Sequence, residues 1–108
     1  MRYESVNLAA GVETLVVALC LDYERREEAM RVGSVSHRTD MEYRYLNFKI
    51  YDAAAEIVGE RDACLFINEI GRKVGYAQSE IGAMSEAAYK IRKREVKVNI
   101  AKKLHLID

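Results

Sequence analysis

Apolar residues recur at three- and four-residue intervals along most of this chain, which is the spacing of one face of an α-helix. The first such stripe consists of Leu8, Val12, Leu15, Leu19, Tyr23 and Met30. It predicts a helix over residues 6–30 whose charged end, residues 22–28, is a solvated face. Residues 33–37 read Gly-Ser-Val-Ser-His and predict a loop.

The next periodic segment predicts a helix over residues 39–58, with Thr39 or Asp40 as its N-cap. One apolar face carries Met41, Tyr45, Phe48 and Ala55, and another carries Leu46, Ile50, Ala53 and Ile57. A helix that is apolar on two faces must be covered on both. We therefore expect it to lie inside a helical bundle or between the bundle and a dimer partner.

Gly59 ends that helix, and the short connection predicts an antiparallel third helix over residues 61–74. Its core side is formed by Ala63, Phe66, Ile67, Ile70 and Val74. A short element follows near residues 78–83. The last helix begins after Ser85, which supplies an N-cap oxygen, and Glu86 sits in its first turn, where the helix dipole favours an anion.

The composition fits these helical patterns. Of 108 residues, half are apolar and about a third are charged, proline is absent and there are six glycines. We expect one all-α domain over residues 1–108, a small bundle of four to five helices. Residues 1–60 would form the bundle and a dimer surface, and residues 61–108 a helix-turn-helix-like unit.

The formal net charge of zero hides an uneven distribution. Residues 1–69 hold 8 Arg and Lys against 13 Asp and Glu, a net charge of −5, and residues 70–108 hold 9 against 4, a net charge of +5. On the last helix, helical spacing places Lys90, Arg94 and Lys97 on one face, with Lys93 beside them. A local basic patch of this kind can attract an anionic partner despite the neutral total.

Other chemistry is not indicated. Cys20 and Cys64 lie far apart in apolar context, so each is expected to be a small core residue in a reduced, cytoplasmic protein without an export signal. His37 and His105 have no neighbours at ligand spacing, so no metal is expected. The apolar run 15–21 is too short to span a bilayer. We find no enzyme signature, cofactor motif or small-molecule substrate site.

The glycines at the start of the basic region permit a helix-turn-helix in two registers. In the first, over residues 67–86, Gly71 is the close-contact residue, Gly75 is the turn, and residues 78–80 begin the reading helix. In the second, Gly82 is the turn and Ser85 caps the reading helix. The second register is favoured, because it places cations rather than Glu80 where phosphates would lie.

Two strings near the end of the chain support this interpretation. They are Met84-Ser85-Glu86-Ala87-Ala88-Tyr89-Lys90-Ile91-Arg92-Lys93-Arg94-Glu95-Val96 and Ile100-Ala101-Lys102-Lys103-Leu104. They resemble the C-terminal end of small phage and prophage transcriptional regulators of the autolysin-regulator type, which are similar in style to region 4 of bacterial sigma factors. There a Ser-acid-x-x-Tyr stretch opens the reading helix. The resemblance covers the last quarter to third of the chain and implies duplex DNA as the partner.

Two functions therefore remain open. The first is a phage-type transcriptional regulator, a homodimer whose DNA contacts come from Ser85, Glu86, Lys90, Lys93, Arg94 and Lys97. The second is a helical interaction protein with no nucleic-acid role. A continuous basic surface would favour the first function, and cations paired with the acidic N-terminal half would favour the second.

Overall fold

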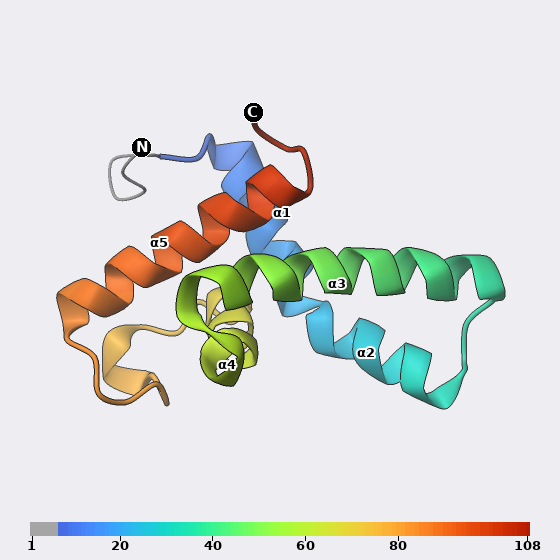
Figure 1. Cartoon of the computed structure of the whole chain (residues 1–108), viewed down its shortest axis with the longest axis horizontal. Helices are drawn as coiled ribbons and strands as arrows, with labels where there is room; N and C mark the ends of the chain where they lie inside the picture. Colours follow the sequence, from blue (N-terminus) through green and yellow to red (C-terminus); the bar gives the residue numbers. More distant parts are fainter. Residues whose placement is uncertain (1–6) are drawn as a thin grey trace.

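The computed structural model describes residues 7–108, which form five α-helices and one short 3-10 helix. In chain order these are α1 (Ala10–Leu21), α2 (Tyr23–Val32), α3 (His37–Val58), α4 (Glu60–Gly71), η2 (Tyr76–Gln78, the 3-10 helix) and α5 (Glu86–Lys103). No strand occurs in residues 7–108, so the predicted all-α bundle is confirmed. Figure 1 shows α3 as the longest helix, with α2 beside its first half and α4 and α5 packed near its second half.

α3 begins two residues earlier than expected. Its N-cap is Ser36, whose hydroxyl oxygen accepts a hydrogen bond from the Thr39 backbone N–H at 3.2 Å. The predicted cap at Thr39 or Asp40 is therefore wrong. The helix ends at Val58, as predicted, and buries Asn47, Ile50, Ala53 and Ala54. This buried side includes Ile50 and Ala53 of one predicted apolar face, so that face is confirmed as core.

The single helix expected over residues 6–30 is two helices, α1 and α2, separated at Asp22. In a continuous helix the Leu19 carbonyl would accept from the backbone N–H of Tyr23. Here that carbonyl accepts from the Arg26 guanidinium at 2.6 Å, and Arg26 is buried. The prediction that residues 22–28 are a solvated face is therefore wrong at Arg26. The predicted first residue of the helix, Val6, lies outside the described residues.

α4 follows α3 after one residue, Gly59, and ends at Gly71, before the predicted Val74. Lys73 takes a left-handed backbone conformation with φ of 56°. Its N–H bonds the Ile70 carbonyl at 3.2 Å, and the Val74 N–H bonds the Glu69 carbonyl at 2.9 Å. This pair of bonds closes the helix in a Schellman motif, which usually employs glycine at the left-handed position.

The connection from α4 to α5 occupies residues 72–85 and is not the short turn of a helix-turn-helix. In the first register, residues 78–80 were to begin the reading helix, but η2 ends at Gln78 and Ser79 is extended. That register is wrong. In the second, the helix start after Ser85 is confirmed, but the segment before Gly82 is not helical, so Gly82 does not join two helices. Gly71 is a close-contact residue, but it contacts α1 rather than the next helix.

The core is shared by the helices around α3. Its largest fully buried side chains are Tyr89, Phe66, Ile50, Ile67, Ile100, Val16, Val96 and Val98. The Phe66 and Tyr89 rings have centroids 5.8 Å apart. Burial raises the pKa of the Cys20 thiol to about 12, consistent with its predicted core role. Cys64 is exposed, so its predicted core position is wrong.

Within residues 7–108, each helix is too short or too polar to cross a lipid bilayer.

Candidate nucleic-acid interface

The N-terminal end of α5 is capped and exposed. The Ser85 hydroxyl oxygen accepts a hydrogen bond from the Ala88 N–H at 3.1 Å, which confirms the predicted N-cap. Glu86 lies in the first turn and pairs with Lys90, one turn further on, at 2.9 Å. All three candidate residues, Ser85, Glu86 and Lys90, are exposed, so an external partner can reach this end of the helix.

Lys93 lies one turn further along and has a different environment. Its ammonium donates to the Val74 carbonyl oxygen at 2.7 Å and lies 5.1 Å from the centre of the Tyr89 ring. Burial lowers the pKa of Lys93, and the positive charge of Lys97 lowers it further. Lys93 therefore fastens α5 to the segment after α4 while part of its side chain still reaches the surface.

Lys97 links α5 to α1. Its ammonium donates to the Glu13 carboxylate at 2.7 Å. The hydrogen bond and the charge of Lys97 lower the pKa of Glu13, and the charges of Arg94 and Lys73 act in the same direction. Arg94 is exposed on the same side of α5. Glu13 is thus a single carboxylate that lies within the field of several cations.

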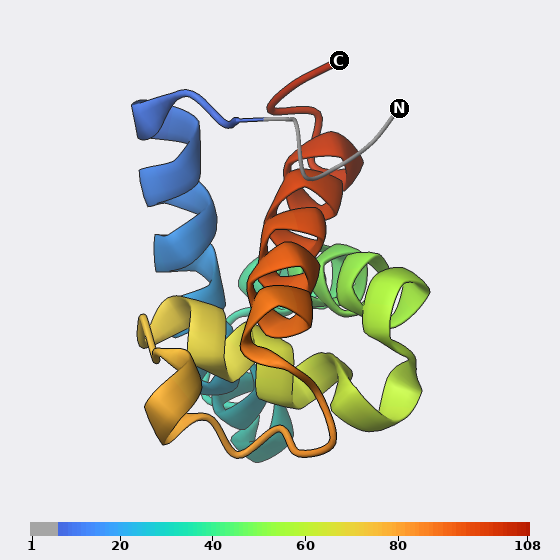
Figure 2. The same ribbon diagram turned by 90° about the vertical axis from the view of Figure 1, so that its left-hand side faces the viewer.

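Lys73, Lys93 and Lys97 line a groove of about 470 Å³ between α1, the end of α4 and α5. Its lining residues are Glu13, Thr14, Val17, Ile70, Lys73, Val74, Gly75, Lys93 and Lys97. In Figure 2, α1 and α5 stand side by side, with α4 and the segment that follows it below them. The sequence patterns did not indicate Lys73, because its place in the groove depends on the left-handed turn that ends α4. We call this feature the lysine groove.

Glu69 is a buried residue near the lysine groove that the sequence patterns also missed. Glu69 is buried and accepts hydrogen bonds from the Tyr89 hydroxyl at 2.6 Å, the Ser79 hydroxyl at 2.7 Å and the Glu80 backbone N–H at 2.8 Å. Burial acts to raise the pKa of Glu69, but the hydrogen bonds outweigh it and the pKa is lowered. One carboxylate therefore joins α4, the connection and α5. The only signal in the sequence is an acidic residue within the apolar stretch 63–70.

In this network Tyr89 is buried and its hydroxyl donates inward, to the Glu69 carboxylate. Tyr89→Phe should lower the free energy of unfolding by about 1–2 kcal/mol, because a buried carboxylate loses one of its donors. Chemical denaturation at neutral pH measures the loss.

The same variant has a pH signature. The folded-state pKa of Glu69 is depressed, so its contribution to stability is present above the unfolded value, near 4.5, and disappears as the pH falls through the folded value. The difference in the free energy of unfolding between Tyr89→Phe and the wild type should therefore shrink as the pH falls below about 4.5 and through the folded-state pKa of Glu69. A difference that stays constant down to lower pH would contradict this account of Glu69.

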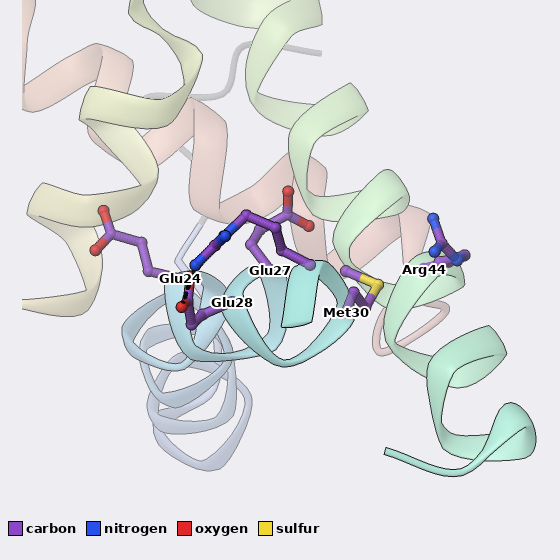
Figure 3. A pocket seen from close by; sticks show the side chains of 6 residues that line it. Glu24, Glu27, Glu28, Met30 and Arg44 are labelled. Atoms are coloured by element: carbon purple, nitrogen blue, oxygen red, sulfur yellow. Dashed lines mark hydrogen bonds and ion pairs between the residues drawn. The ribbon is translucent and has the colours of Figure 1, made fainter. Parts of the chain in front are cut away.

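A second, more open concavity of about 420 Å³ lies between α2 and α3 (Figure 3). It is lined by Glu24, Glu27, Glu28, Met30, Arg31 and Arg44. Figure 3 shows the carboxylates of Glu24 and Glu27 lying apart rather than converging, and Glu28 pairs with Arg31 at 2.5 Å. Among the described residues, no group of three or more His, Cys, Asp or Glu side chains is placed to hold a metal ion.

The other predicted apolar face of α3 is largely uncovered. Met41, Tyr45 and Phe48 are 57%, 56% and 63% exposed, and only Ala55 of that face packs against the core. Three large apolar side chains at helical spacing form a continuous stripe, which is typical of a contact surface for another protein. We call Met41, Tyr45 and Phe48 the α3 stripe.

The distribution of ion pairs bears on the two functions considered from the sequence. Lys97 pairs with Glu13, and Lys103 pairs with Asp52 and Glu56, all in the acidic N-terminal half. Such pairs are expected if the chain is a helical interaction protein with no nucleic-acid role. Lys90, by contrast, is exposed and pairs with Glu86 of its own helix. α5 therefore carries both cations that pair with the N-terminal half and a cation that does not.

No protein-family model, curated protein or solved structure matches this chain.

Proposed function

We propose that this chain binds duplex DNA with the basic face of α5 and acts as a transcriptional regulator of phage or mobile-element type. The observation that carries the proposal is the gathering of Lys73, Lys93 and Lys97 around one groove. Lys90 and Arg94 lie on the same side of α5. Cations in such an arrangement supply sequence-independent affinity for the DNA backbone.

The resemblance of the C-terminal third to small phage regulators supplies the regulatory part of the proposal. Ser85 and Glu86 lie at the start of α5, where the residues of a reading helix that approach base edges are found. Because α4 and α5 lack a short turn, α5 would dock as a single helix, steadied by Glu69 and Lys93 rather than by a helix-turn-helix partner.

The test is fluorescence anisotropy with a labelled random duplex across a series of salt concentrations. The wild type should bind at low salt, and binding should weaken steeply as salt rises. Lys90→Ala/Arg94→Ala/Lys97→Ala should flatten the plot of log K against log salt, with the slope falling by about 1 for each phosphate that the variant no longer neutralises.

A matched control removes the same charge elsewhere. Arg25→Ala/Arg31→Ala/Arg61→Ala deletes three exposed arginines from the N-terminal half. This control should keep most of the wild-type salt slope. If the wild type fails to bind even at low salt, or if both triple variants lose binding equally, DNA binding by α5 is ruled out.

The second candidate function is a helical interaction protein, and the exposed α3 stripe favours it. We propose that a second copy of this chain covers the stripe. A two-fold axis beside the α3 stripe would let the same three side chains of each copy cover those of the other. A dimer of this kind is compatible with DNA binding, because α5 packs against the second half of α3 while the stripe lies in its first half.

Light scattering at micromolar concentration tests the dimer. The wild type should have the mass of two chains, and Phe48→Glu should have the mass of one, because the substitution places a carboxylate in the apolar contact. Leu21→Glu makes the same change at an exposed leucine on α1 and should remain dimeric. A wild type with the mass of one chain would contradict the proposed dimer.

A further inference from the structure

Among residues 7–108, the lining of the lysine groove holds more cations than carboxylates. Three lysine side chains line it, from the turn after α4 and from successive turns of α5, against one carboxylate, Glu13. Lys93 is half-buried, and its ammonium is repelled by Lys97 and attracted by the buried Glu69 carboxylate, so the two carboxylates near the groove still face three lysines. An additional anion in the groove would relieve that repulsion, so the site as it stands is incompletely compensated.

The walls of the groove strengthen such an interaction. Val17, Ile70 and Val74 contribute apolar surface beside the ammonium groups. Ion pairs at an apolar wall are screened less than ion pairs in open solvent. A volume of about 470 Å³ leaves room for an anion larger than a carboxylate.

The Glu13 carboxylate is an anion that already lies among the lysines of the groove. Its carboxylate bonds Lys97 at 2.7 Å, and its side chain is 48% exposed, so it can leave the groove without disturbing the core. A phosphate group has more acceptor oxygens than a carboxylate, so it can accept hydrogen bonds from more than one of the lysines that line the groove. Glu13 contacts Lys97 and therefore holds a position that such a ligand would need.

We infer that the lysine groove is a binding site for a phosphate group and that Glu13 is an internal competitor that occupies the site when no phosphate is bound. The phosphate comes from a DNA backbone or from a phosphorylated small molecule. The first source rests on the proposed function, and the second does not.

The decisive variant is Glu13→Gln, which removes the competing charge and keeps the shape of the side chain. Its matched control is Glu56→Gln. Glu56 also pairs with a lysine of α5, its side chain is also 48% exposed, and it lies away from the groove. Both variants change the net charge by the same amount, so a difference between them reports on the groove.

Two probes separate the sources. Against a labelled random duplex at low salt, Glu13→Gln should bind about two- to five-fold more tightly than the wild type, and Glu56→Gln should not. Adding Lys73→Ala to Glu13→Gln should remove the gain. With inorganic phosphate, compared with chloride at equal ionic strength, amide NMR shifts of Lys73, Val74 and Gly75 should move further in Glu13→Gln than in wild type.

The outcomes are distinct. If Glu13→Gln strengthens duplex binding and Glu56→Gln does not, the result supports a DNA backbone phosphate in the groove. If no duplex binds but inorganic phosphate shifts the groove amides, the proposed DNA function fails while the phosphate site stands, with a small molecule as its source. Equal responses of Glu13→Gln and Glu56→Gln, or groove amides that phosphate leaves unmoved, would overturn the inference.

Discussion

Replacing Gly71 by alanine is expected to destabilise the protein by about 2–3 kcal/mol, although alanine favours helix formation. Gly71 is the last residue of α4 and lies against the end of α1. A Cβ atom there would meet the backbone nitrogen of Leu21, would come within 2.6 Å of its Cα, and would lie 2.8 Å from the carbonyl carbon of Cys20. These are backbone atoms, so a side chain cannot rotate away to make room. The two helices would have to separate.

Thermal or chemical denaturation measures this loss. The control is Gly11→Ala, because Gly11 is also in a helix but has no atom within 4 Å of the position that its Cβ would take. Gly11→Ala should raise the stability by about 0.5–1 kcal/mol, the difference in helix propensity. If Gly71→Ala is as stable as Gly11→Ala, the close approach of α1 and α4 does not exist in solution.

The other large effect is expected at Arg26. Its guanidinium donates to the Leu19 carbonyl and to the Asn47 side-chain oxygen, both at 2.6 Å, while the residue is only 2% exposed. Arg26→Met keeps the length of the side chain and removes its donors. The buried Asn47 oxygen and the partly buried Leu19 carbonyl then lose their partner, so we expect a loss of about 3–5 kcal/mol in the free energy of unfolding.

Arg25→Met is the control for this change. Arg25 is the adjacent residue and also pairs with Asp22, but its side chain is exposed. Its ion pair is screened by water, so the unfolding midpoint should stay close to that of the wild type. Equal effects of the two substitutions would show that Arg26 does not hold the junction between α1 and α2.

The junction also explains why the sequence pattern was wrong there. The stripe from Leu8 to Met30 has continuous helical spacing, and Arg26 lies in a charged run that is typical of a solvated face. At the break the Arg26 guanidinium bonds the Leu19 carbonyl, and Asn47, on α3, accepts a second hydrogen bond from the same guanidinium. That partner is 21 positions away in the chain, and no local pattern contains it.

At the basic end of the chain, too, local features were predictable from the sequence and tertiary contacts were not. Ser85 was identifiable as a cap because capping is a local interaction between a hydroxyl oxygen and a backbone N–H three residues later. Lys90, Lys93, Arg94 and Lys97 were placed on one side of α5 from helical spacing alone. Their different environments were not predictable, because Lys93 bonds the Val74 carbonyl and Lys97 bonds Glu13 of α1.

Local patterns were enough to establish the helical class, the bounds of α3 to within two residues, the start of α5 and its charged face, because hydrophobic period, capping and propensity act over a few neighbouring positions. Tertiary packing was needed to establish where α1 ends, that Glu69 joins three segments, and that Lys73 lines the same groove as Lys93. These features depend on burial and on hydrogen-bond partners that other helices supply. A buried polar group is stable only where folding brings a partner to it, and that partner lies in a distant part of the chain.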